Sequence, residues 1–311
     1  MGMNIDESRH LQLDRESKGT RYYRNAVERH WDPGEIDLTT DRANLADYVE
    51  ETDRGIDVLN GLRRGVARFG AGEQAVTEDL APLAIALDDI DDQMFVTTQI
   101  YEEAKHTDFF DRFWREVIHP VEDEFGLERS SPTDKDWFND AYNELFERNE
   151  AAMHALLDDR SPQAFAEAYC HYHLTVEGIL AQTGYYGMQQ SYSEDSHPEL
   201  PALPGLYRGF TKIRQDEGRH VGFGMTKLKE LVTEEGVDPQ FLDDTVNELM
   251  PLVTGITADD EEQYLENLGP EPTELREFAT GKHVDRMTQI TEASEEIPSV
   301  ETLTELEGVD A

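Results

Sequence analysis

Two segments of this chain pair a glutamate with a histidine three residues later, Glu103 with His106 and Glu217 with His220. Both pairs lie in long runs with helical periodicity. On a helix that turns by about 100° per residue, Glu103 and His106 share a face with Phe110. An ionised carboxylate on such an apolar face costs several kcal/mol unless positive charge compensates for it. The chain must therefore bring positive charge to these glutamates, and a bound metal ion would supply it.

Two further glutamates, Glu73 and Glu177, stand alone in apolar helical segments. The order along the chain is thus Glu, Glu-x-x-His, Glu, Glu-x-x-His. A helical bundle with an embedded dinuclear carboxylate site uses this inventory, with one glutamate from each of two helices and one Glu-x-x-His pair from each of the other two. The alternative is four separately buried structural glutamates, which the cost of burial disfavours. The candidate metal ligands are Glu73, Glu103, His106, Glu177, Glu217 and His220.

Other acidic residues near these motifs are weaker candidates. Glu78 and Asp79 lie off the helix face of Glu73, and we expect both to be solvated. Glu102 points about 100° away from Glu103 on its helix.

Two histidines and one aspartate remain to be placed. His171 and His173 have no glutamate three residues before them, so we interpret them as surface residues or as residues behind the ligands. Asp216 precedes a candidate ligand and could accept the outer N–H of a ligand histidine, which would fix its tautomer. An ordinary acidic residue is the alternative for Asp216.

The chain reads as long helices with short interruptions, and no alternating strand pattern competes with them. We expect helices near residues 43–69, 73–87, 94–120, 131–159, 163–191, 206–236, 239–254 and 272–291. The glycines of "GAG" (70–72) separate the first two, and Pro120 ends the third. We divide the chain into an irregular N-terminal segment (1–40), a helical metal-binding domain (41–291) and a mobile acidic tail (292–311). The fold class is all-α.

The charge balance is strongly acidic, with 68 Asp and Glu against 27 Lys and Arg and a formal net charge of −41. Such a surface repels nucleic acid phosphates and anionic lipid head groups, so neither is an expected partner. An acidic coat suggests a halophilic source with a cytosol of very high salt, where screening removes most of the self-repulsion. The alternative is an acidic protein without that adaptation.

The chain carries no sign of an oxidising compartment or of a membrane. Cys170 is the single cysteine and cannot form an intrachain disulfide. The N-terminal "MGMNIDESRH" lacks an apolar segment, and no run of roughly 18 apolar residues occurs. We therefore expect a cytoplasmic protein with no membrane insertion.

Four segments resemble one known family. "GEQAVTEDLAPL", "MFVTTQIYEEAKH", "YHLTVEGILAQTGYYG" and "DEGRH" are similar to the ligand-binding oxidases related to the ribonucleotide reductase small subunit, in the ferritin-like superfamily. The resemblance spans about residues 70–225. It implies a ferritin-like four-helix bundle core with additional helices, and an oxidoreductase that activates dioxygen at a manganese and an iron ion. It also implies a long-chain fatty acid bound in a tunnel, a two-electron oxidation and a homodimer.

The resemblance also implies a place for each metal. Glu73, Glu103 and His106 would hold the first ion, manganese. The second ion, iron, would be held by Glu177, Glu217 and His220, with Glu103 as the bridge. A di-iron site stays possible, because oxygen-rich donors with one imidazole per ion accept both metals.

In that family an ether cross-link joins a valine and a tyrosine, which correspond here to Val76 and Tyr172. Tyr172 lies five residues before Glu177, and an ideal α-helix would point the two about 140° apart. A π-bulge would bring them together. On residue type alone both would be ordinary core residues. Tyr185 either lines the site or simply packs in the core.

Three other readings remain open. A ribonucleotide reductase small subunit commonly has a radical tyrosine four residues after the first ligand histidine, where this chain has Phe110, and its tail carries a tyrosine that this tail lacks. A non-catalytic lipid-binding or metal-binding protein is the second alternative, and iron storage is disfavoured by chain length.

The spacing of the first two glutamates is slightly short for the oxidases, and that of the last two is slightly long.

We expect the fold to loosen at low salt, because the negative surface charges then repel each other over longer distances. The melting temperature, followed by circular dichroism, should fall as potassium chloride is reduced from molar to millimolar concentration. A melting temperature indifferent to salt would contradict the halophilic interpretation.

Overall fold

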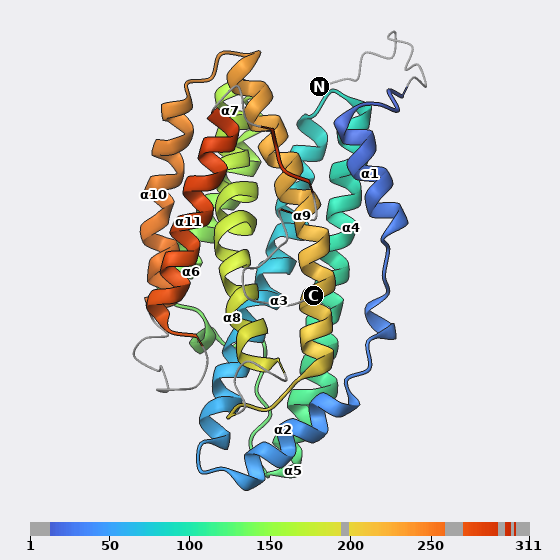
Figure 1. The fold of residues 1–311 in the computed structure, drawn as a ribbon, viewed down its shortest axis with the longest axis vertical. Helices are drawn as coiled ribbons and strands as arrows, with labels where there is room; N and C mark the ends of the chain where they lie inside the picture. The colour runs from blue at the N-terminus through green and yellow to red at the C-terminus, as the bar shows by residue number, and fades with distance from the viewer. Residues whose placement is uncertain (1–12, 194–198, 259–269, 292–295, 300–301, 303–311) are drawn as a thin grey trace.

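The computed structural model describes residues 13–193, 199–258, 270–291, 296–299 and 302. Within this part of the chain all regular structure is helical, which confirms the all-α fold class (Figure 1). The α-helices are α1 (Lys18–Glu28), α2 (Thr39–Glu51), α3 (Gly55–Ala86), α4 (Ile90–Phe113), α5 (His119–Glu124), α6 (Asp140–Ala155), α7 (Pro162–Tyr169), α8 (Gln182–Tyr192), α9 (Pro204–Thr233), α10 (Pro239–Ala258) and α11 (Pro272–Thr291). Two π-helices are η2 (Trp114–Ile118) and η4 (Cys170–Ala181), and two short 3₁₀ turns are η1 (Pro33–Glu35) and η3 (Lys135–Trp137).

Four long helical segments form the core bundle. They are α3, α4, α9 and the continuous run α7–η4–α8, and they stand side by side in Figure 1. α3 packs along α4, and α9 packs against α4, η4 and α8. Outside this core, α10 and α11 cover η4, α1 lies against α4 and α9, and α2 and α5 close one end. The ferritin-like bundle with additional helices is thereby confirmed.

The predicted interruption at "GAG" is wrong, because α3 runs unbroken through it. A Cβ on Gly70 would lie 3.2 Å from Phe110 Cβ, and one on Gly72 would lie 3.3 Å from Phe146 Cζ. These glycines therefore give neighbouring rings room to approach the helix. The chain breaks earlier instead, between Glu51 and Gly55.

We expected the N-terminal segment (1–40) to be irregular, but part of it forms helix α1. Ser17 caps α1 by accepting a hydrogen bond from the Thr20 backbone N–H at 3.0 Å. On α1, Tyr22 packs against Phe95 of α4 with ring centroids 5.4 Å apart. Pro120 likewise does not end its helix but stands at the start of α5. Most of the expected acidic tail, 292–311, lies outside the described residues.

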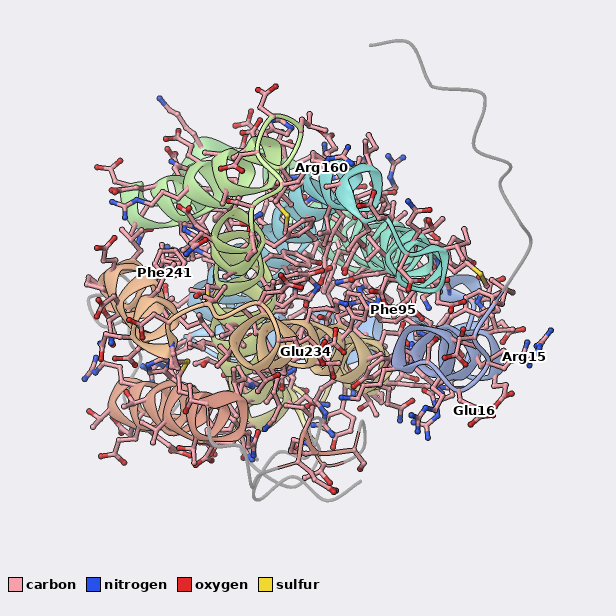
Figure 2. All side chains as sticks on the ribbon, turned by 90° about the horizontal axis from the view of Figure 1, so that it is seen from above. Arg15, Glu16, Phe95, Arg160, Glu234 and Phe241 are labelled. Carbon is pink, nitrogen blue, oxygen red and sulfur yellow. The ribbon has the colours of Figure 1, made fainter. Side chains whose placement is uncertain are left out.

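Charged groups surround an apolar interior. Seen along the bundle in Figure 2, Arg15 and Arg160 lie on the outside, and both are exposed, whereas Phe95 is fully buried. Over the described ranges, every helix is too short or too polar to cross a membrane.

The start of α9 is held by another helix. Asp41 of α2 accepts hydrogen bonds from the backbone N–H groups of Gly205 (2.8 Å) and Leu206 (2.7 Å). These are orphan donors at a helix N-terminus, so Asp41 acts as a cap supplied from outside α9. A Cβ on Gly205 would lie 2.6 Å from the Asp37 carbonyl oxygen and 2.7 Å from Asp41 Oδ2.

We expect Gly205→Ala to lower the free energy of unfolding by roughly 1–3 kcal/mol, since backbone atoms must move to admit the methyl group. Urea denaturation of the metal-free protein would measure the loss. The control is Gly281→Ala in α11, where a Cβ would have no neighbour within 4 Å. That variant should be neutral or stabilising by up to about 1 kcal/mol. Equal behaviour of the two would show that the contact between α2 and α9 is not tight.

Candidate metal centre

The structure brings all six candidate ligands together inside the bundle. They come from α3, α4, η4 and α9, and every one is buried, from fully enclosed histidines to 6% exposure at Glu73. Two groups of four donors result, and in each group the candidate ligand atoms lie within 4.8 Å of one another. The first group is Glu73, Glu103, His106 and Glu217, and the second is Glu103, Glu177, Glu217 and His220.

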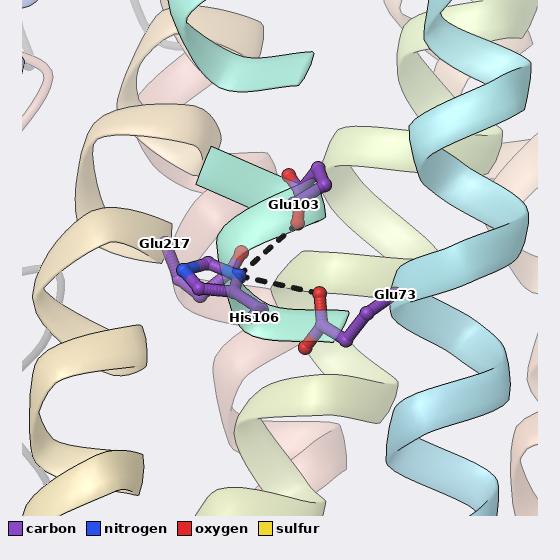
Figure 3. Close-up of side chains that lie close together, drawn as sticks. All are labelled: Glu73, Glu103, His106 and Glu217. Atoms are coloured by element: carbon purple, nitrogen blue, oxygen red, sulfur yellow. Dashed lines mark hydrogen bonds and ion pairs between the residues drawn. The ribbon is translucent and has the colours of Figure 1, made fainter. Parts of the chain in front are cut away.

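His106 is the centre of the first group (Figure 3). Its Nδ1 lies 3.3 Å from Glu73 Oε2 and 3.3 Å from Glu103 Oε2. Glu217 Oε1 is 3.5 Å from the same nitrogen. One imidazole nitrogen and three carboxylates thus converge on one point.

His220 has the same role in the second group. Its Nδ1 lies 3.0 Å from Glu103 Oε1, 3.3 Å from Glu177 Oε1 and 3.4 Å from Glu217 Oε2. Glu103 and Glu217 therefore each present one oxygen to either group. The family resemblance implies a bridging position for Glu103 only, and the geometry adds Glu217.

Unpaired atoms in the cluster fit a pair of metal ions. Glu177 Oε2 is buried without a hydrogen-bond partner, and the contacts of Glu217 Oε2 and His220 Nδ1 within the cluster lack hydrogen-bond geometry. A buried carboxylate oxygen without a partner is costly, so these atoms are better explained as metal ligands than as structural groups. Carboxylate oxygens with one imidazole per ion suit iron or manganese.

Burial and the neighbouring charges also shift the pKa values of the glutamates and histidines in the cluster. Burial raises the pKa of Glu73 and of Glu177 well above the usual glutamate value. Burial alone would lower the pKa of His106 and His220, but the adjacent carboxylates outweigh it and raise both. The metal-free cluster thus retains protons that metal ions would displace on binding.

The outer nitrogen of each ligand histidine meets an acidic residue from the other helix. His106 Nε2 on α4 lies 3.1 Å from Asp216 Oδ2 on α9, and His220 Nε2 on α9 lies 2.9 Å from Glu102 Oε2 on α4. Such contacts hold the ring orientation and direct Nδ1 toward the metal. Asp216 thus contacts the outer nitrogen of a candidate ligand histidine.

Glu102 was missed, although the sequence contains a signal for it. The segments "EEAKH" (102–106) and "DEGRH" (216–220) share the order acid, glutamate, small residue, base, histidine. In both, the leading acid supports the histidine of the opposite segment. The angle between Glu102 and Glu103 led us to rank Glu102 low, yet Glu102 is only 2% exposed because it faces α9.

The basic residues of the two segments neutralise the leading acids. Arg219 Nη2 is within ion-pair distance of both Glu102 and Asp216. Lys105 Nζ lies 2.8 Å from Asp216 Oδ2, and Trp31 Nε1 donates to the same oxygen at 2.7 Å. Burial raises the pKa of Asp216, but His106, Arg219 and Lys105 together hold it well below the usual aspartate range.

The π-helix η4 brings Tyr172 to the cluster. In an α-helix Tyr172 and Glu177 would diverge, but residues 170–181 follow the wider π-helical path. The Tyr172 hydroxyl donates to Glu103 Oε1 at 2.9 Å. Val76 stands one turn after Glu73, is 4% exposed and shares a hydrophobic cluster with Tyr172.

A cavity of about 570 Å³ leads from the cluster along α3 and α8 toward the surface. Glu73, Glu103 and Glu217 lie at its inner end, with Val76 and Tyr185 in its wall. Five glycines of α3 and α8 are among the residues that line it, and they are Gly61, Gly65, Gly72, Gly184 and Gly187. The walls are mostly apolar.

Asp79, which we expected to be solvated, is buried, and so are His171 and His173, for which the sequence left open the surface or a place behind the ligands. Asp79 is 6% exposed and accepts a hydrogen bond from Asn149 at 2.9 Å, and burial raises its pKa to about 6. His171 is 8% exposed, and burial lowers its pKa to about 4. His173 is fully buried behind the ligands. Tertiary packing against α6 and α9 covers these positions, whereas Glu78 is exposed as expected.

An all-α bundle whose four core helices bring two carboxylate and histidine clusters together is a ferritin-like dinuclear carboxylate protein. No protein-family model matches the chain. Several solved structures of R2-like ligand-binding oxidases, however, are similar to it.

A valine-to-isoleucine variant of such an oxidase, with anaerobically reconstituted Mn/Fe cofactor, is 30% identical to this chain with a TM-score of 0.75, covering 90% of this chain and 95% of that one. A tyrosine-to-phenylalanine variant with aerobically reconstituted Mn/Fe cofactor is also 30% identical. Its TM-score is 0.75, and the match covers 90% of this chain and 95% of that one. A glutamate-to-aspartate variant is 29% identical with a TM-score of 0.77, covering 91% and 99%. The chain belongs to the R2-like ligand-binding oxidases and is therefore an oxidoreductase.

We expect Glu102→Gln to weaken metal binding by roughly 10–100-fold, because His220 loses the charged acceptor that orients it. Competition with a chelating dye would measure the affinity under anaerobic conditions. The control is Glu78→Gln, at an exposed position of α3, which should bind metal normally. Unchanged affinity in Glu102→Gln would show that His220 does not depend on this contact.

Proposed function

We propose that this protein is a dinuclear Mn/Fe oxidase that activates dioxygen, joins Val76 to Tyr172 by an ether cross-link and binds a long-chain fatty-acid-like ligand. The observation that carries the proposal is the Tyr172 hydroxyl, which meets the shared ligand Glu103 at 2.9 Å. An ordinary core tyrosine would not need to contact a residue common to both metal groups.

The metal assignment follows the two donor groups. Glu73, Glu103 and His106 would hold manganese, and Glu177, Glu217 and His220 would hold iron, with Glu103 and Glu217 between them. The similar oxidases with reconstituted Mn/Fe cofactor support this choice, although the same donors accept two iron ions. When bound, the metal pair would supply the redox-active site at which dioxygen is reduced.

The residues of the chain have defined tasks in the cross-link. One hydrogen leaves a Val76 side-chain carbon and one leaves the Tyr172 oxygen, a C–O bond forms, and dioxygen accepts the two electrons and two protons. Glu103 Oε1 already accepts the Tyr172 hydrogen bond and is placed to take its proton. The surrounding apolar residues exclude water from the reacting atoms.

The cavity supports the proposed class of ligand. Along α3, the distance from Glu73 to Asp57 at the outer end is about 24 Å at the helical rise per residue. A narrow apolar cavity of this length that ends at metal ligands suits an extended hydrocarbon chain with a carboxylate at the metal end. A two-electron oxidation of such a ligand fits the same site, with Tyr185 as a further wall residue.

The ribonucleotide reductase reading finds no support at residue 110. Phe110 lies in an aromatic cluster, stacked on Phe69 at 5.7 Å and tilted against Phe210 at 5.6 Å. No phenol stands there to hold a radical. The homodimer, the halophilic source and the cytoplasmic location remain predictions, supported in turn by the resemblance, by the acidic composition and by the single cysteine with no long apolar run.

We expect protein reconstituted anaerobically with both metals and then exposed to air to contain one manganese and one iron per chain and to lose the mass of two hydrogen atoms. Peptide mapping should place the loss on peptides that contain Val76 and Tyr172. Metal analysis and intact mass spectrometry before and after air provide the measurement. Tyr172→Phe should keep both metals and show no mass loss.

Two outcomes would contradict the proposal. Bound metals without any mass change would favour a passive carrier or a reductase subunit. A Tyr172→Phe variant that binds no metal would mean that Tyr172 supports the metal site and has no part in a cross-link.

A further inference from the structure

Gln99 is a neutral amide enclosed among the charged groups of the metal centre. It stands on α4 one turn before Glu103 and is fully buried. Its Nε2 lies 3.2 Å from the Tyr172 oxygen and 3.1 Å from Glu177 Oε1. Its Oε1 lies 3.4 Å from His173 Nε2. The amide therefore touches the proposed cross-linking residue, a candidate metal ligand and a second histidine.

The contacts define which way the amide points. The NH₂ end of Gln99 faces Glu177 Oε1, which accepts from it when Glu177 is ionised, as a metal ligand would be. The carbonyl end then faces His173, which can donate from Nε2 as the neutral imidazole. Burial lowers the pKa of His173 well below its usual value, which keeps the ring neutral. His173 Nδ1 has no hydrogen-bond partner, in agreement with the proton lying on Nε2.

His173 itself cannot turn away. Its ring lies 4.6 Å from the Tyr172 ring and 5.1 Å from the Tyr169 ring, centroid to centroid. On the α9 side it packs against Gly224, where any Cβ would overlap the His173 side chain. The ring is thus a fixed donor for the Gln99 carbonyl.

The result is a defined orientation of the Tyr172 hydroxyl. A phenol oxygen has one O–H and acceptor lone pairs. The O–H points to Glu103 Oε1, and one lone pair accepts from Gln99 Nε2. The remaining lone pair of the Tyr172 oxygen is then available for the new bond to the Val76 carbon. Without Gln99, the hydroxyl could rotate about its C–O bond and place its proton elsewhere.

We propose that Gln99, oriented by His173, is a positioning residue that aims the Tyr172 oxygen for cross-link formation. This inference rests on the proposed function, in which Tyr172 forms the cross-link. The bond changes are those given above, with dioxygen as the oxidant, and Gln99 itself gains and loses no atoms.

The first test is Gln99→Leu, which keeps the approximate size and removes all three hydrogen bonds. We expect both metals to bind, and the cross-link to form about tenfold more slowly, as a barrier higher by about 1.4 kcal/mol gives. Intact mass against time after exposure to air measures the rate. The matched control is Gln182→Leu, because Gln182 is a buried amide whose side chain has no hydrogen-bond partner. It should cross-link at the wild-type rate.

The second test addresses His173 and provides an independent variant in case Gln99→Leu folds poorly. His173→Phe keeps a ring but removes the donor, so the Gln99 amide can turn over and cross-linking should slow. His173→Gln restores a donor and should recover part of the rate. Equal rates in these two variants would remove His173 from the proposal.

A readout on metal-free protein separates this inference from the proposed function. In crystal structures of the metal-free proteins, the Tyr172 oxygen should stay on Glu103 in wild type and move away in Gln99→Leu. Wild type that never cross-links overturns the proposed function, whatever the oxygen position. Wild type and Gln99→Leu that cross-link equally fast, or a Gln99→Leu variant that fails to bind metal, overturn the positioning role alone.

Discussion

The fold of this protein depends on four buried glutamates whose negative charge must be compensated inside an apolar core. Glu73, Glu103, Glu177 and Glu217 are almost completely enclosed, and the two histidines between them cannot neutralise four carboxylates. Cations must complete the cluster, and carboxylates can surround cations only if they come from several directions at one level. This requirement explains why four long helices run side by side and why η4 departs from α-helical geometry at that level.

The charged residues behind the two ligand histidines join α4 to α9. Each ligand histidine is supported by the acid of the opposite segment, Glu102 for His220 and Asp216 for His106, and Arg219 bridges the two acids. A slide of one helix along the other would therefore misdirect both imidazoles at once. Since a buried carboxylate left without its partner is costly, the two clusters form as one unit.

Much of the centre could be predicted from sequence because helical periodicity places the ligands on one face of each helix. Periodicity treats one helix at a time, so its errors occur at residues whose burial or contacts depend on a neighbouring helix. Glu102 points away from Glu103 on its own helix, yet it points toward α9. Asp79 is covered by α6, and "GAG" continues as helix because neighbouring rings require small residues there. The sharing of Glu217 between both groups depends on interhelical distances, which no sequence pattern contains.

The acidic composition has a consequence for traffic into the site. The long-range potential of a chain with net charge −41 draws divalent cations inward and turns anions away. Salt weakens both effects as the Debye length shrinks from about 10 Å at 0.1 M to about 3 Å at 1 M. We therefore expect metal loading to be fastest at low ionic strength, whereas the proposed anionic ligand should enter more readily as ionic strength rises. The same surface field acts on the two with opposite sign.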